Sequence, residues 1–340
     1  MLFSPESRPS PRAEDHACPT GWPFSYHSLT IFTQVRGRGV LGSSRWTSEG
    51  GILLAGASSQ GKRKGKTISA IKRHPLIAFF VLAYALTWWA SILYAVYPNP
   101  FPVFPYGPFL AAIIVTGLTL GRAGLRRLLR RIVLWRVGLR WYAVALLLPV
   151  ALALAAVYLN VLLGASAPSL EELGSWPSLL VLFPLTLLIG GPLGEEPGWR
   201  GYALPRLQTG RSALTASLIL GALIALWHLP LLLTSEEPVP AGAFFPEIIA
   251  GMIVVSWVYN NTQGSVLLAA LIHTSHNAIE GFFGDMFSGG DLARLYWMLA
   301  GVWILTAVVV IIVAGPADFS RKYGKQEEPS TVAASPPRVR

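Results

Sequence analysis

Three short groups of polar residues interrupt stretches of sequence that are otherwise apolar. They occupy positions 194–201, 226–230 and 273–277. Together they contain carboxylates, imidazoles and an amide, which are the side chains that hydrolytic enzymes use to activate water and to stabilise an oxyanion. A polar side chain inside an apolar span is costly unless it is paired, hydrated or functional. The three groups therefore indicate a functional site within a membrane.

The first group carries two adjacent carboxylates, Glu195 and Glu196, followed by Arg200. Neighbouring residues on a helix point about 100° apart, so the two carboxylates face different surroundings. Glu196 and Arg200 are four residues apart and can pair on one face, which leaves Glu195 free to face a cavity. Pro197 is expected to kink the helix or to mark its restart. Read alone, this group also fits an ordinary ion pair at the membrane interface.

The third group places His273 and Asn277 four residues apart, on one face of a helix. His276 lies somewhat to the side, and Glu280 is expected to continue the face of His273 and Asn277. In the second group, His228 is the only ionisable residue of its span. Each histidine taken singly also fits a hydrogen-bonded contact between helices. A spare carboxylate, histidines and an amide in one bilayer favour a shared site.

In this order the groups resemble the motifs of the CPBP family, the CAAX-protease and bacteriocin-processing (Abi) intramembrane endopeptidases. The family motifs are Glu-Glu-x-x-x-Arg, Phe-x-x-x-His and His-x-x-x-Asn/Asp, on successive membrane helices. The matching positions are Glu195-Glu196-x-x-x-Arg200, Ile224-x-x-x-His228 and His273-x-x-x-Asn277. The resemblance covers roughly residues 75–315. The sequence departs from these motifs at Ile224, where the family usually has phenylalanine. We expect this position to affect packing or substrate preference.

Hydrolysis of a peptide bond needs a held water, a base and donors for the oxyanion. We expect Glu195 to be the base and His228 to help hold the water. His273 and Asn277 would donate to the oxyanion, and the resemblance implies the same roles. The substrate would be a peptide or a membrane-anchored protein, such as a prenylated C-terminal peptide, a bacteriocin leader or an anchored regulator.

Metal dependence is left open by the resemblance, because the family is described both as metalloproteases and as glutamate-type peptidases. Glu195, His228 and His273 could form a two-histidine, one-carboxylate zinc site with a position open to water. Asn277 is a poor zinc ligand. The site without a cofactor is the first choice, and zinc is the alternative.

The elements that must position these residues are membrane helices. Hydrophobic residues make up 53% of the 340 residues and charged residues only 13%. A span needs roughly 20 apolar residues, and its backbone polar groups must be satisfied internally. The chain is therefore predicted to be an all-α, polytopic transmembrane bundle of about eight spans. The expected spans are 75–97, 104–121, 141–163, 178–201, 213–234, 243–260, 265–284 and 295–315.

Basic residues gather before the first span and after the second, fourth and eighth spans, which predicts that both termini are cytoplasmic. The arginine-rich stretch 122–140 has the period of a helix lying on anionic lipid. Residues 1–74 and 316–340 are predicted to be disordered cytoplasmic tails around a 75–315 protease domain, and residues 1–66 need not be translated. The expected location is a bacterial plasma membrane. The net charge is +10, and the basic residues lie beside apolar segments. They indicate membrane topology and lipid contact, not nucleic acid.

A non-enzymatic membrane transporter or binding scaffold is the rival interpretation, because buried polar groups can also line a substrate or proton path. Transporters often carry repeat-related broken helices. The sequence has no repeat at the level of these motifs. This absence favours the protease.

The charge pattern predicts which loops face the cytoplasm. In a variant lacking Cys18, a cysteine at position 171 or 236 should react with an impermeant thiol reagent added outside. A cysteine in the loop 206–211, or at either terminus, should react only from the cytoplasmic side. Labelling of position 171 from the cytoplasm alone would invert the topology.

Overall fold

The computed structural model describes residues 69–96, 104–234 and 239–320. Cys18, Glu236 and most of the two predicted tails lie outside these residues. The described part of the chain consists of helices and their connections, without a strand. This confirms the all-α class. The α-helices are α2 (Pro75–Val96), α3 (Gly107–Ile132), α4 (Leu139–Leu162), α5 (Leu170–Gly174), α6 (Leu179–Leu188), α7 (Pro192–Gly198), α8 (Leu204–Gln208), α9 (Ala213–Trp227), α10 (Leu229–Thr234), α11 (Ala241–Asn261), α12 (Val266–Gly284) and α13 (Gly289–Ala314).

Fewer helices than the eight expected spans meet a length and hydropathy criterion within the described residues. Within the described residues, six helices are long and apolar enough to cross a membrane, or seven if the bent pair Leu170–Leu188 and Pro192–Gln208 forms one span. The six are α2, α3, α4, the unit of α9 with α10, α11 and α13. α12 is not among them, and it carries the polar residues of the third sequence group. Its role in the bundle therefore depends on packing against neighbours.

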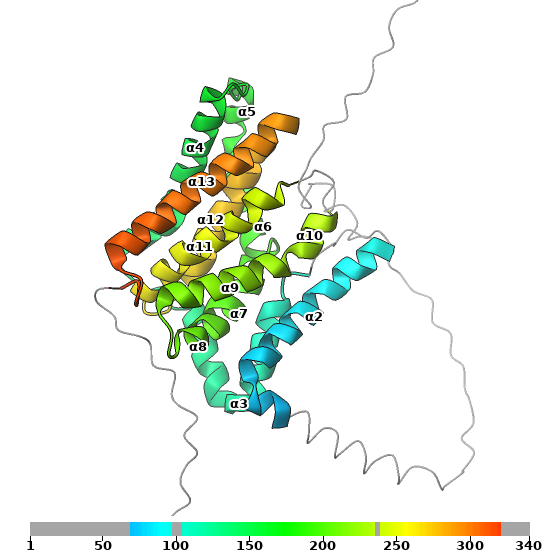
Figure 1. The fold of residues 1–340 in the computed structure, drawn as a ribbon, viewed down its shortest axis with the longest axis vertical. Coiled ribbons are helices and arrows are strands. Elements are labelled where there is room, and N and C mark those ends of the chain that lie inside the picture. The colour runs from blue at the N-terminus through cyan, green and yellow to red at the C-terminus, as the bar shows by residue number, and fades with distance from the viewer. Residues whose placement is uncertain (1–68, 97–103, 235–238, 321–340) are drawn as a thin grey trace, which may run out of the picture.

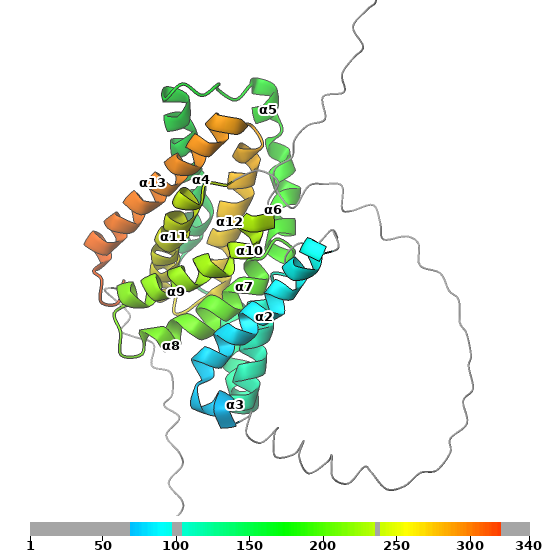
Figure 2. The same ribbon diagram turned by 45° about the vertical axis from the view of Figure 1, so that its right-hand side comes forward.

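The helices form two sets with the motif helix between them. α4, α11, α12 and α13 lie together in the upper left of Figure 1, and α2 pairs with α3 at the lower right. Figure 2 shows the same division after rotation. α7 lies at the junction, where it contacts α3, α6 and α12. The segment with the two adjacent glutamates is thus the centre of the bundle.

The motif segment is held by an aromatic cluster from α2 and from the π-helical turn η3 (Trp199–Ala203), which directly follows α7. Phe79 stacks on Tyr202 at 4.7 Å between ring centroids and meets Trp199 edge to face at 5.7 Å. All three side chains are fully buried. Interdigitated aromatic rings have few alternative arrangements, so they fix α7 and η3 against α2.

The bend in the motif span does not lie at Pro197, where the sequence suggested a kink. α6 and α7 are bent by 40° around residues 189–191, and Gly191 has φ 116°, a region that favours glycine. Pro192 then occupies the first turn of α7, where its missing N–H costs nothing. Pro197 lies inside α7, just before η3. Widened π turns are frequent at functional sites.

The arginine-rich stretch is helical as expected, but only as far as Ile132. Gly121, with φ 59°, kinks α3 and separates its apolar first half from its basic second half. Arg131 donates to the Gly201 carbonyl at 3.3 Å and to the Tyr259 hydroxyl at 3.0 Å. The basic half therefore packs against the motif segment as well as presenting charge.

The segments next to the basic loops meet at one end of the bundle. Tyr202 donates its hydroxyl to the Pro75 carbonyl at 3.2 Å, and the Ala213 N–H donates to the Ala317 carbonyl at 2.6 Å. Phe319 is fully buried, and the carbonyls of Pro316 and Ala317 accept hydrogen bonds from the start of α9. Residues 69–73 are helical. This shared end matches the charge pattern, while its cytoplasmic orientation stays a prediction.

The contact between α7 and α3 can be tested at Gly198, where the two helices approach closely. A Cβ on Gly198 would lie 2.6 Å from the backbone of Pro108, which cannot give way as a flexible side chain can. Gly198→Ala should therefore lower the free energy of unfolding by about 1–3 kcal/mol, measured by thermal or denaturant unfolding in detergent. The matched control is Gly251→Ala in α11, where nothing lies within 4 Å of the added Cβ. Equal stability of both variants would contradict the α3–α7 contact.

Candidate active site

Glu195 lies in the first turn of α7 and is 5% exposed. The Trp199 indole N–H donates to its Oε2 at 3.3 Å, one helical turn further on. A Cβ at position 191 would collide with its Oε1, so glycine at the bend leaves space for the carboxylate. The bend and the tryptophan together fix this side chain. Trp199 was not among the residues that sequence reasoning singled out, although its i,i+4 spacing from Glu195 is visible there.

Glu196 makes the ion pair with Arg200 that the sequence predicted, at 2.7 Å between Oε1 and Nη1. Both side chains are buried to 1% exposure or less. The same Oε1 also accepts from Nδ1 of His273 at 2.8 Å, which joins α7 to α12. Arg200 additionally reaches the Met252 sulfur of α11 at 2.9 Å. The Glu196–His273 contact joins residues 77 positions apart, so no local pattern could reveal it.

His273 is oriented by this contact. Its Nδ1–H donates to the Glu196 carboxylate, which leaves Nε2 available to the site. The side chain keeps 19% of its surface exposed, unlike the buried Glu196. Asn277 lies one turn further along α12 and is also partly exposed. Both side chains on this face are thus partly exposed.

His228 lies where α9 ends and α10 begins. α9 runs without a break to Trp227 and stops there. Nδ1 of His228 donates to the Ile224 carbonyl at 2.9 Å, and the ring meets Trp227 and Phe244 edge to face. Its Nε2 is left free for other partners. The histidine is therefore fixed at a discontinuity of the span.

These elements converge on Glu195. Its carboxylate lies within electrostatic range of both His228 and His273. His276 of the same helix pairs with Glu280 at 3.1 Å and lies 3.7 Å from Glu247 of α11. Seven residues after His273, Glu280 stays on the face of His273 and Asn277, as expected. Sequence reasoning missed Glu247, a single carboxylate near the start of an apolar span.

The distances between candidate ligand atoms bear on the alternative of a bound zinc ion. In the described residues, only Glu247, His276 and Glu280 bring three ligand atoms within 4.8 Å of one another. Glu195, His228 and His273 do not form such a group, so as arranged here they do not fit a shared zinc ion. His228 and His273 hold their Nδ1 atoms on protein acceptors.

Comparison with known proteins agrees with the fold and the motifs. Residues 176–279 match the family model described as "Type II CAAX prenyl endopeptidase Rce1-like". The chain is similar to CAAX prenyl protease 2 of Methanococcus maripaludis, with 26% identity over 226 residues, which cover 61% of this chain and 83% of the relative. The matched family segment includes all three polar groups of the sequence.

The membrane bundle and the matched segment together define an integral membrane protein of the intramembrane protease class. The matched family model and the relative support the CPBP or CAAX protease family, which the three motifs predicted.

Because Glu196 shares one oxygen between Arg200 and His273, replacing Glu196 should destabilise the protein more than replacing Glu195. Glu196→Gln leaves Arg200 as a buried charge without its partner and should cost about 3–5 kcal/mol in detergent unfolding experiments. Arg200→Gln should cost a similar amount. Replacing both residues should restore part of the loss, because no lone charge remains.

Glu195→Gln is the matched control, since it keeps the volume and makes no ion pair with Arg200. Its unfolding midpoint should stay close to that of the wild type. An unfolded Glu195→Gln together with a stable Glu196→Gln would reverse the roles assigned to the two carboxylates.

Proposed function

We propose that the protein is an endopeptidase that cleaves a membrane-anchored protein or peptide with a water activated by Glu195, without a metal ion. The observation that carries the proposal is the placement of Glu195. It is a buried carboxylate held by Trp199, in the electrostatic neighbourhood of two histidines with free Nε2 atoms. A stable bundle alone does not require such a costly arrangement.

In the proposed reaction, Glu195 takes a proton from a water molecule held with the help of His228. The resulting hydroxide attacks the carbonyl carbon of the peptide, and the carbonyl oxygen becomes an oxyanion. Glu195 then delivers the proton to the leaving nitrogen as the C–N bond breaks. Positioned general bases of this kind typically contribute about 10²- to 10⁴-fold to the rate.

His273 and Asn277 are the proposed donors to the oxyanion. Donation from His273 Nε2 requires a proton on that atom, while Nδ1–H already bonds to Glu196. The doubly protonated ring would carry a positive charge, which the adjacent Glu196 carboxylate stabilises. The Asn277 amide would add a second, neutral donor. One donor to an oxyanion is typically worth about 3–4 kcal/mol in the transition state.

The metal-free form is proposed because the three candidate zinc ligands are not drawn to a common point in the described structure. The first-choice mechanism then uses only side chains already fixed by protein contacts. Zinc held by Glu195, His228 and His273 would require these donors to move together. Activity that persists in a chelator, with the protein still folded, is the corresponding expectation.

The relative's name refers to prenylated CAAX proteins, in which a lipid is attached to a cysteine near the C-terminus. A prenylated C-terminal peptide is accordingly the first substrate class to test here. Ile224, which replaces the family phenylalanine, is 2% exposed and its carbonyl binds His228. The position serves core packing, so the replacement does not argue against such a substrate.

Cleavage provides the test that separates a protease from a transporter. Purified protein in detergent or liposomes should cleave peptides of a library that includes prenylated and unprenylated C-terminal sequences. Glu195→Gln should lower the rate by roughly 10²- to 10⁴-fold, because the base is lost. The rate is followed by mass spectrometry of the products.

Glu171→Gln is the matched control, because Glu171 is an exposed carboxylate of α5. It should leave the rate unchanged. A folded Glu195→Gln variant that cleaves as fast as the wild type would eliminate Glu195 as the base. Absence of cleavage by the wild type across the library would favour the transporter or scaffold.

A further inference from the structure

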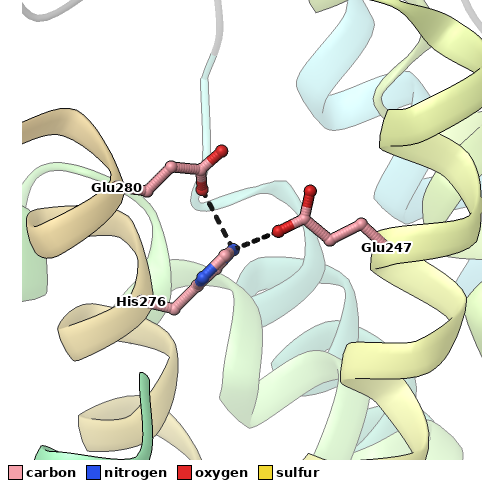
Figure 3. A group of neighbouring side chains, drawn as sticks. All are labelled: Glu247, His276 and Glu280. Atoms are coloured by element: carbon pink, nitrogen blue, oxygen red, sulfur yellow. Dashed lines mark ion pairs between the residues drawn. The ribbon is translucent and has the colours of Figure 1, made fainter. Parts of the chain in front are cut away.

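A second polar cluster joins α12 to α11, beside the proposed active-site residues of α12. Figure 3 shows His276 and Glu280 of α12 and Glu247 of α11 pointing toward one another. Nε2 of His276 lies 3.1 Å from a Glu280 oxygen and 3.7 Å from a Glu247 oxygen. The proposed active-site chemistry uses none of the three side chains.

Glu247 is the unusual member of this cluster. It is 5% exposed, and neither carboxylate oxygen has a hydrogen-bond partner in the structure. A buried carboxylate without hydrogen bonds loses its hydration and receives nothing in return. Its side chain is directed at His276 and Glu280 (Figure 3). The orientation indicates that a further group completes the cluster.

Charge balance narrows the nature of that group. In the described part of the chain, the ion pairs of Glu247 and Glu280 are with His276 alone. With both carboxylates ionised, one imidazole can offset at most one of the two charges. A divalent cation offsets both and leaves the histidine neutral, which is the form that binds a metal.

We propose that Glu247, His276 and Glu280 bind a divalent metal ion of the zinc type, through one oxygen of each carboxylate and Nε2 of the histidine. Nitrogen and oxygen ligands at about 2.0–2.2 Å in a tetrahedron lie roughly 3.4 Å apart. The two observed ligand separations, 3.1 and 3.7 Å, bracket this value. The fourth position is left for water.

The ion would connect α11 to α12. α12 already binds α7 through His273 and Glu196. The ring of His276 is further held edge to face by Trp303 of α13, at 5.1 Å between centroids. A metal at this place therefore supports the helix that carries His273 and Asn277 without touching Glu195.

The test uses the full-length protein, purified in detergent and stripped of metal with a chelator that is then removed. Zn²⁺ at roughly a hundred times its Kd should raise the thermal unfolding midpoint by about 5–10 °C. After desalting, elemental analysis should find about one equivalent of zinc. Co²⁺ in its place should give a visible absorption band of a tetrahedral site.

Glu247→Gln should lose the zinc-dependent shift, the retained zinc and the cobalt band. Metal-free Glu247→Gln should unfold no earlier than the metal-free wild type, because an unsatisfied buried charge has been removed. Glu280→Gln and Glu247→Asp give the same test if Glu247→Gln fails to fold. Glu195→Gln is the control for zinc at the proposed active site, and it should keep all three signals.

A wild type that binds no zinc would overturn the proposal and leave a proton shared between the carboxylates. The proposal also fails if Glu195→Gln loses the zinc while Glu247→Gln keeps it, since the metal would then belong to the proposed active site. Equal zinc retention by every variant would mean adventitious binding and would equally overturn it. Cleavage activity enters none of these outcomes, so the metal site and the proposed peptidase function can fail separately.

Discussion

A single carboxylate oxygen organises the centre of the protein. Oε1 of Glu196 accepts from Arg200 on its own helical segment and from His273 on α12. In an environment that offers little water, each of these groups needs the other two, because a lone buried charge is far more costly than a satisfied one. The oxygen thereby sets the distance and rotation between α7 and α12. That rotation also sets the positions of Glu195 and Asn277, since these residues lie on the same two helices.

Helix interruptions serve the same end. The bend at Gly191 makes room for the Glu195 carboxylate, and the π turn after α7 places Trp199 and Tyr202 in the aromatic cluster with Phe79. His228 lies at the end of α9, with its Nδ1 on the Ile224 carbonyl. Backbone groups released by a broken span need partners in a membrane, and here protein contacts supply them. The proposed catalytic side chains are thus fixed by the same features that interrupt the helices.

α12 makes two sets of polar contacts with different consequences. His273 binds Glu196 of α7, next to the proposed base, and His276 pairs with Glu280 and Glu247. A helix this polar is not held in a membrane by hydropathy, and it is absent from the six helices that pass the length and hydropathy criterion within the described residues. Contacts with α4, α6, α7 and α11 hold it instead. Its position is a property of the whole bundle.

The sequence by itself determined the all-α membrane class, most of the spans, the Glu196–Arg200 pair, and the three motifs that indicated the family. These features depend on apolar runs and on i,i+4 spacing, which act within one helix. It misplaced the bend of the motif span, which lies around Gly191 and not at Pro197. Only the tertiary structure decided the Glu196–His273 contact, the approach of Glu247 to His276, and the convergence of His228 and His273 on Glu195. Each of these joins separate helices, whose relative rotation is set by packing between them and not by the period of either one.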